Sequence, residues 1–101
     1  MALPKLTPEE KRQALLKAQD MRSRRAKIRE NLKSGKVELK DILSRADEEV
    51  VAKMRVAYLL QSLPQIGKVT SRKIMDEIGI HESRRVQGLG KRQIDALLER
   101  F

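Results

Sequence analysis

The chain has no cysteine among its 101 residues, which excludes disulfide bridges and thiolate metal sites. Tyr58 and Phe101 are its only aromatic residues. Because proteins that bind single strands stack bases on aromatic side chains, this scarcity favours contact with a duplex through its backbone. No apolar run reaches the roughly 18 residues of a membrane span, and no signal-peptide core follows Met1. We therefore expect a cytoplasmic protein that makes no membrane contact.

Positively charged residues outnumber acidic residues in the sequence. Lysine and arginine number 23 against 14 acidic residues, which gives a formal net charge of +9. Residues 1–50 hold 13 cations and 9 acids, and residues 51–101 hold 10 and 5, so the excess is not confined to a tail. A basic surface of this extent favours a polyanionic partner, with nucleic acid ahead of an anionic membrane.

The length predicts one domain, and the apolar spacing predicts helices throughout. We expect an all-α fold in which a long basic N-terminal helix, within residues 1–35, packs on a compact helical core of residues 36–101. Thr7, Pro8 and Glu10 form the N-cap, first position and capping box of the long helix. It should run for about 25 residues, to about Leu32, before Ser34 and Gly35 end it.

The long helix has a weak apolar stripe, so much of its length cannot be buried. Residues 11–29 carry eight cations against the single acid Asp20. A solvated face explains such a run as readily as a nucleic-acid contact does. As a secondary contact with DNA, the candidate residues are Arg22, Arg24, Arg25 and Arg29.

The rest of the chain predicts short helices. The first spans 37–46, and a second starts with Asp47 as its N-cap, with a break near Lys53–Arg55. Further helices are expected over 56–63, 68–78 and 91–100, separated at 81–90 by a loop. In helix 68–78 we expect four residues to point inward: Val69, Ile74, Met75 and Ile78.

A tight turn between two of these helices is the first candidate site. Pro64 cannot continue the helix before it, and Gly67 permits unusual backbone angles or a close approach. The free N–H groups at the start of the next helix then favour an anion such as phosphate. The candidate residues here are Gly67, Lys68, Val69, Arg72 and Lys73. An ordinary turn with surface lysines remains the alternative.

The loop before the last helix repeats the arrangement. Gly88 and Gly90 allow close backbone approach, the amide of Gly90 belongs to a second set of free N–H groups, and arginine can bind phosphate bidentately. The candidate residues are Ser83, Arg84, Arg85, Gly88, Gly90, Lys91 and Arg92. The alternative is a solvated loop whose glycines serve only its turns.

The first turn resembles the helix-hairpin-helix motif in its Leu63, Pro64, Ile66, Gly67 and Ile74. Gln65 stands where that motif usually has a glycine, and Ser71 replaces a usual alanine. The two turns together, over 60–98, resemble the helix-two-turns-helix module. Four segments then narrow the resemblance to the actinobacterial integration host factor family: residues 1–9, 53–56, 63–69 and 82–90.

The resemblance implies a nucleoid-associated protein that binds double-stranded DNA with little sequence preference, bends or organises it, and assists phage site-specific integration with the integrase–DNA complex. Gln87 departs from the basic residue of some relatives. A ribosomal or structured-RNA-binding protein built on the same module is the alternative. We expect a monomer. We also expect no catalysis, cofactor or metal, because the chain pairs no nucleophile with a base and has one histidine, His81.

Overall fold

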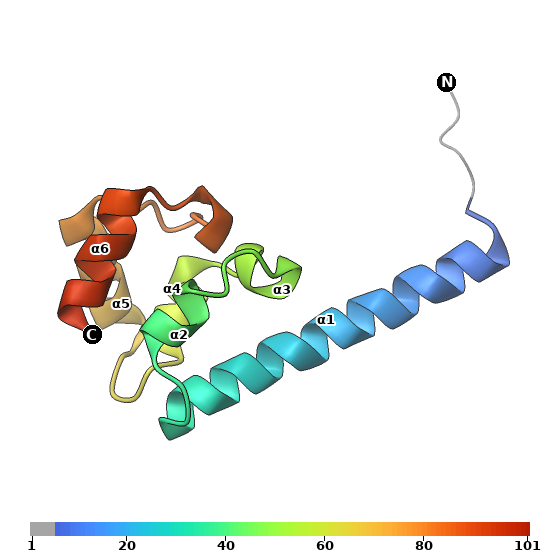
Figure 1. The fold of residues 1–101 in the computed structure, drawn as a ribbon, viewed down its shortest axis with the longest axis horizontal. Coiled ribbons are helices and arrows are strands. Elements are labelled where there is room, and N and C mark those ends of the chain that lie inside the picture. The colour runs from blue at the N-terminus through green and yellow to red at the C-terminus, as the bar shows by residue number, and fades with distance from the viewer. Residues whose placement is uncertain (1–5) are drawn as a thin grey trace.

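The computed structural model describes residues 6–101, so residues 1–5, which begin the predicted arm, lie outside the described part. Its elements are α1 (Pro8–Ser34), α2 (Leu39–Leu43), α3 (Glu49–Ala52), α4 (Val56–Gln61), α5 (Lys68–Ile78), the 3₁₀ turn η1 (Val86–Gly88) and α6 (Lys91–Arg100). Within these residues there is no strand, although Arg55 and Arg85 form an isolated antiparallel bridge. The predicted all-α fold with a long first helix is confirmed (Figure 1).

Helix α1 begins and ends where local chemistry requires. The Glu10 N–H donates to the Thr7 hydroxyl over 3.1 Å, and the Thr7 N–H donates back to the Glu10 carboxylate over 3.3 Å. At the other end Gly35 has φ 80°, a left-handed angle that favours glycine. The capping box is as predicted, and the helix continues to Ser34.

Only the C-terminal half of α1 joins the core. Ile28 and Leu32 are buried there, whereas Leu15 and Leu16 on the other half are exposed. The first turns of α1 extend past α3, away from the other helices (Figure 1). The weak apolar stripe therefore leaves half of the helix projecting into solvent.

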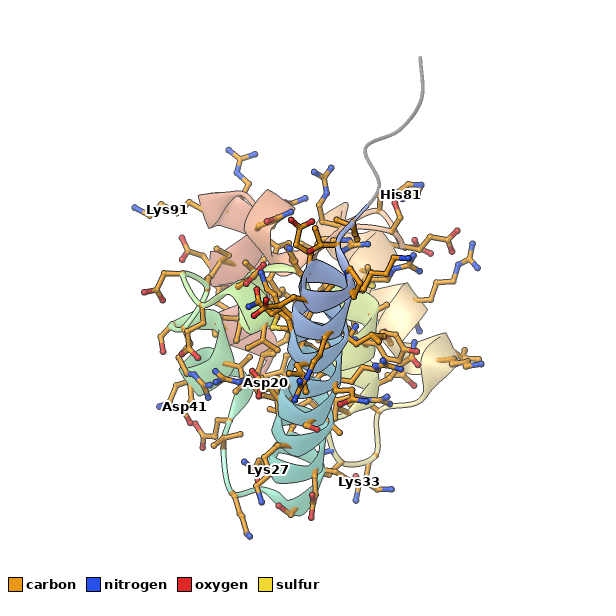
Figure 2. The ribbon with its side chains drawn as sticks, turned by 90° about the vertical axis from the view of Figure 1, so that its right-hand side faces the viewer. Asp20, Lys27, Lys33, Asp41, His81 and Lys91 are labelled. Atoms are coloured by element: carbon orange, nitrogen blue, oxygen red, sulfur yellow. The ribbon has the colours of Figure 1, made fainter. Side chains whose placement is uncertain are left out.

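The core lies among the five short helices, with the C-terminal half of α1 packed against it. α4 packs on α5, α6 on α2 and α5, and α3 on α1 and η1. Its fully buried large residues are Leu32, Ile42, Val51, Val56, Leu59, Leu60, Met75 and Leu97. Charged side chains surround this core, with Lys27 and Lys33 of α1 and Lys91 of α6 reaching outward (Figure 2). No helix among the described residues is long and apolar enough to cross a membrane.

Three predicted boundaries were wrong. Helix α2 covers only Leu39–Leu43, because the chain turns over 44–47. Glu48 rather than Asp47 is the N-cap of α3. Helix α4 ends at Gln61, where the Ser62 hydroxyl donates to the Tyr58 carbonyl over 2.7 Å and the following proline disfavours a helical Leu63. The predicted break is confirmed, since Lys53 ends α3 and Arg55 precedes α4.

Helix α5 has the predicted bounds but not all of the predicted inward face. Gly79 ends it with φ 87°, and the buried Ile80 donates its N–H to the Met75 carbonyl over 2.8 Å. Val69, predicted to point inward, is 83% exposed, and Ser71 is buried instead. The inward face of α5 runs through Ser71, Ile74, Met75 and Ile78 at i, i+3, i+4 and i+7, and Val69 lies off this stripe.

Candidate nucleic-acid interface

The first turn leaves the start of α5 open. Gly67 is the N-cap, with φ −95° and ψ −175°, and no side chain caps the helix. The first helical hydrogen bond runs from the Ser71 N–H to the Gly67 carbonyl over 2.9 Å. The N–H groups of Lys68, Val69 and Thr70 therefore have no partner within the helix. A Cβ added at Gly67 would meet no other heavy atom within 4 Å, so this side of the turn is open and an anion can approach these amides.

The strained residue of this turn is Gln65 rather than Gly67. Gln65 has φ 66°, and it is the only non-glycine residue with a positive φ in the described chain. It occupies the position where the helix-hairpin-helix pattern has a glycine, and its side chain is exposed. The turn thus has a left-handed backbone angle at a position without glycine, the residue that adopts such an angle most readily. The backbone angles of Gly67 suit any residue. Its role in the turn is therefore to leave the amides of α5 open to an anion.

In the second turn, the start of α6 is held by Gln93, which was not among the predicted site residues. The Gly90 N–H donates to the Gln93 side-chain oxygen over 2.9 Å, so this amide, predicted to be free, is occupied. The Gln93 side-chain nitrogen donates to the Gly79 carbonyl over 3.1 Å, which joins the end of α5 to the start of α6. The spacing of Gly90 and Gln93 is that of a capping box, and this spacing could have revealed the contact.

Three amides remain at the start of α6. The Ile94 N–H donates to the Gly90 carbonyl over 3.0 Å, so the N–H groups of Lys91, Arg92 and Gln93 lack partners in the helix. Lys91 and Arg92 are both exposed at this end. The site is therefore an amide-lined helix start with two cationic side chains, without the contribution expected from the Gly90 N–H.

Arg84 and Arg85, both predicted as DNA contacts of the same loop, point to different parts of the molecule. The Arg84 guanidinium donates to the Gly88 carbonyl over 3.3 Å, beside the start of α6. The Arg85 guanidinium donates instead to the Lys53 carbonyl over 3.3 Å, between α3 and α4. Neighbouring residues of an extended segment face opposite sides, and Arg85 is extended, with φ −101° and ψ 161°.

A short pairing holds this loop on the core. The Val56 N–H donates to the Arg84 carbonyl, and the Val86 N–H donates to the Met54 carbonyl, each over 3.0 Å. These bonds flank the bridge between Arg55 and Arg85, whose side chains are therefore close neighbours. Arg55 was not among the predicted site residues. Only the resemblance over 53–56 pointed to its segment, because the pairing joins positions far apart in the chain.

The remaining predicted cations and Ser83 are exposed around the two turns. Arg72 of α5 lies 3.6 Å from the Glu82 carboxylate, which links the first turn to the loop of the second. The Ser83 hydroxyl lies 2.7 Å from the His81 ring nitrogen Nδ1. Among residues 6–101, Lys68, Lys73, Lys91 and Arg92 have no carboxylate at ion-pair distance.

The four arginines of α1 that were predicted as DNA contacts lie in two different surroundings. Arg24 lies 3.0 Å from the Asp20 carboxylate, in a depression that Glu48 and Glu49 also line. Arg22, Arg25 and Arg29 line a different pocket, beside Arg85. The structure thus brings three of the predicted arginines together and separates Arg24 from them.

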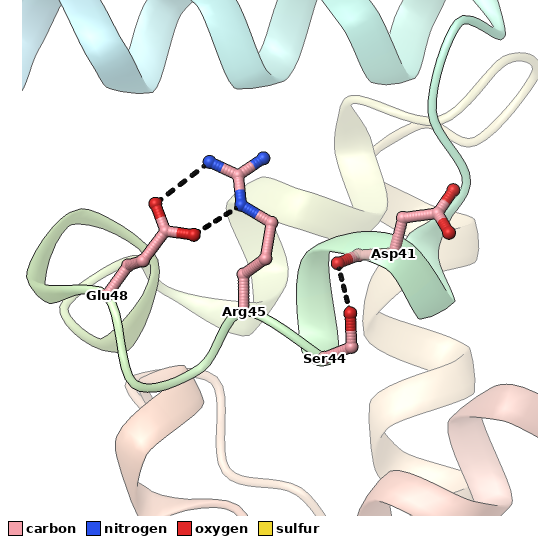
Figure 3. A network of polar contacts seen from close by, with 4 residues as sticks. All are labelled: Asp41, Ser44, Arg45 and Glu48. Atoms are coloured by element: carbon pink, nitrogen blue, oxygen red, sulfur yellow. Dashed lines mark hydrogen bonds and ion pairs between the residues drawn. The ribbon is translucent and has the colours of Figure 1, made fainter.

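Ion pairs gather around the start of α3, and one of them reaches α1. Arg45 donates to Glu48 through Nε over 2.6 Å and through Nη2 over 3.0 Å, as Figure 3 shows, and this bond lowers the pKa of Glu48 and raises that of Arg45. Lys53 donates to Glu49 over 2.9 Å, and this bond is the main reason why the pKa of Glu49 is lowered. The charge of Lys17, 3.5 Å from Glu49, lowers it further and joins α1 to α3.

Comparison with known proteins places the chain in a family. Residues 32–101 match the model of the S13-like H2TH domain, the helix-two-turns-helix module. The whole chain is 48% identical to the integration host factor of Mycolicibacterium smegmatis, over 97% of that protein, and 46% identical to that of Streptomyces coelicolor, over 95%. It is 47% identical to that of Mycobacterium tuberculosis, over 97%.

A solved structure is similar as well. It is described as the structure of sIHF bound to an 8bp palindromic DNA, and it aligns with a TM-score of 0.82 at 42% identity, over 84% of this chain and 97% of that one. The similarity thus extends beyond the two turns to most of the fold, and the resemblance seen in the sequence is confirmed. The chain belongs to the integration host factor family of mycobacteria and Streptomyces and carries an S13-like H2TH domain.

Proposed function

We propose that this protein is a non-enzymatic architectural protein that binds duplex DNA mainly through backbone phosphates and organises or bends it. The observation that carries the proposal is the pair of open helix starts, α5 and α6, each preceded by a glycine and lacking partners for its first N–H groups. The fold neighbour described as bound to DNA supports it. Amides and cations that meet phosphates recognise the shape of a duplex rather than its sequence.

Three further parts of the proposal follow from the family. The protein would act as a monomer, lie in the nucleoid within the cytoplasm, and assist phage integrase–DNA complexes. The formal net charge of +9 supports an extended contact with DNA, and the α1 arginines offer cations for a secondary one. Within the described residues, no group of three histidine, cysteine, aspartate or glutamate side chains could hold a metal ion.

A mobility-shift comparison tests the proposal. Duplex DNA, single-stranded DNA and double-stranded RNA of equal length are each titrated at two salt concentrations. The proteins compared are the wild type, the Arg84→Gln variant and, as the matched control, the Lys36→Gln variant. Lys36 follows α1 and lies outside both turns. We expect duplex DNA to bind best and its affinity to fall steeply with salt, by a log–log slope of about 0.9 for each phosphate neutralised.

Arg84→Gln should weaken binding to all duplex sequences alike, and Lys36→Gln should change it little. Sequence-dependent losses would contradict the phosphate assignment. A ribosomal or structured-RNA-binding function is the second candidate, because the matching module is S13-like. Preference for double-stranded RNA in the same experiment would favour it over DNA.

A further inference from the structure

A pocket of about 340 Å³ lies between α1 and the segment that joins α3 to α4. Nine residues line it, of which six are cationic and none is acidic. The cations come from three separate parts of the chain: Arg22, Arg25 and Arg29 from α1, Lys53 and Arg55 from the α3–α4 connection, and Arg85 from the loop. The fold therefore concentrates positive charge in a hollow.

These charges lack acidic partners within the described chain. Lys53 is paired with Glu49, but the five arginines of the pocket have no carboxylate within 4.0 Å in residues 6–101. Like charges brought together in a concave site raise the local potential and repel one another. A bound anion would relieve this repulsion, so the pocket favours one strongly.

Two of the arginines are already held in place. Arg29 donates through Nε to the Ser62 hydroxyl over 3.0 Å, and its guanidinium lies 4.6 Å from the centre of the Tyr58 ring. Arg85 is fixed by its bond to the Lys53 carbonyl. Because a guanidinium has five N–H groups, each arginine keeps donors for a ligand. Such positioned forks suit phosphate oxygens.

The size and walls of the pocket limit what could occupy it. A volume of about 340 Å³ lies in the range of small-molecule sites and exceeds the need of a single phosphate. Ala26, Met54 and Tyr58 add apolar wall beside the arginines. A duplex spreads its phosphates along its length, whereas these cations converge from three parts of the chain on one hollow. We propose that the pocket binds a small molecule that carries a chain of two or more phosphate groups.

Calorimetry of the full chain without DNA tests the proposal. The probes are ATP, inorganic tripolyphosphate and adenosine, each titrated at low salt. We expect saturable binding of ATP and tripolyphosphate at one site per chain, and no binding of adenosine. ATP tighter than tripolyphosphate would identify nucleotides as the source, while equal affinity would identify any phosphate chain; both results support the site.

Variants Arg25→Gln and Arg55→Gln remove cations from opposite walls of the pocket. Each should weaken tripolyphosphate binding by about tenfold. The matched control is Arg12→Gln, on the exposed first half of α1 and outside the pocket, which should leave affinity unchanged. All five arginines are exposed, and thermal melting of each variant checks that it folds.

Three results would overturn the proposal. The first is no saturable binding of tripolyphosphate or ATP by the wild-type chain. The second is an equal loss in Arg12→Gln, since that would mean attraction to net charge alone. The third is loss of duplex DNA affinity in Arg25→Gln and Arg55→Gln without any loss of polyphosphate affinity, which would assign the pocket to DNA. None of these depends on whether the two turns bind DNA.

Discussion

Gly88 and Arg84 lie so close that a Cβ at position 88 would stand 2.9 Å from the Arg84 Cδ. The Arg84 guanidinium crosses this surface to reach the Gly88 carbonyl. The glycine therefore holds open the path of a cation that is proposed to meet phosphate. It is not needed for its backbone angle, because its φ is not positive.

Gly88→Ala should move the Arg84 side chain and weaken duplex DNA binding several-fold, with little loss of stability, because the flexible arginine can shift. Fluorescence anisotropy with labelled duplex and thermal melting measure the two effects. If the alanine acts through Arg84, the double variant Gly88→Ala with Arg84→Gln should bind no worse than Arg84→Gln alone. Additive losses would show that the alanine obstructs the DNA itself.

Gln93 should matter for stability through its two hydrogen bonds, one at each end of the second turn. Gln93→Ala removes both and should reduce the free energy of unfolding by about 1 kcal/mol, as the loss of a cap does. Gln93→Glu is the matched control, because it keeps the acceptor for the Gly90 N–H and loses only the donor to Gly79. Urea unfolding compares them, and equal losses would contradict a capping role.

Helix ends with local chemistry were predictable. Thr7 and Glu10 cap α1, and Gly79 ends α5, through contacts within a few residues of each other. Placement of the loop residues was not predictable, because Arg85 meets Lys53 across 32 positions of sequence. Spacing cannot reveal such a contact, and so both neighbouring arginines were predicted as DNA contacts of one loop.

The first turn of α5 was predicted only in part. Val69 was predicted to be inward, yet it lies off the stripe of Ser71, Ile74 and Met75 that α5 buries. The candidate amides of that turn were predictable, because a helix start leaves them open wherever it lies. No local pattern supplied Arg55, which depends on how the α3–α4 connection docks, or the bond from Gln93 to Gly79, which depends on how α6 packs on α5.

Gln65 carries a left-handed backbone with φ 66°. Gln65→Gly should raise the free energy of unfolding by up to about 1 kcal/mol, since relief of the strained angle outweighs the added freedom of the unfolded chain. Gln65→Val should lower it by about 1 kcal/mol, because a β-branched side chain tolerates this region poorly. Urea unfolding of the two variants checks the sign, and a more stable valine variant would contradict the assigned strain.

The ion pairs of Glu48 and Glu49 predict a dependence of stability on acid. Both carboxyls have a lowered pKa in the folded chain, through hydrogen bonds from Arg45 and Lys53. Groups of this kind stabilise the fold above their unfolded pKa, about 4.3 for glutamate, and the contribution is lost as pH falls through the folded pKa. The melting temperature should therefore fall as pH drops from 5 to 3 (about one unit either side of that value).

The double variant Glu48→Gln with Glu49→Gln provides the control for this acid effect. It should melt slightly lower than wild type at pH 7, by an amount kept small because the pairs are exposed and screened. Its melting temperature should also fall less between pH 5 and 3, because the wild-type chain loses both pairs as the pH falls below the unfolded pKa of glutamate (about 4.3). An undiminished fall in the variant would place the acid sensitivity in other carboxyls.

Ser71 is 1% exposed, and its hydroxyl has no hydrogen-bond partner among the described residues. An unpaired buried hydroxyl costs about 1–3 kcal/mol, and the helix-hairpin-helix pattern has a usual alanine at this position. Ser71→Ala removes the unpaired group, leaves little empty volume and improves helix propensity. The free energy of unfolding should therefore rise by about 1 kcal/mol.

Urea unfolding measures the effect of Ser71→Ala, and Thr70→Ala serves as the control, because Thr70 is the exposed neighbour in the same helix. The control should change stability by no more than a few tenths of a kcal/mol, as propensity alone does. Loss of stability in Ser71→Ala would mean that the hydroxyl finds a partner, such as an ordered water, when the chain is in solution. Duplex affinity should not change in either variant, since neither side chain supplies a cation to the two helix starts.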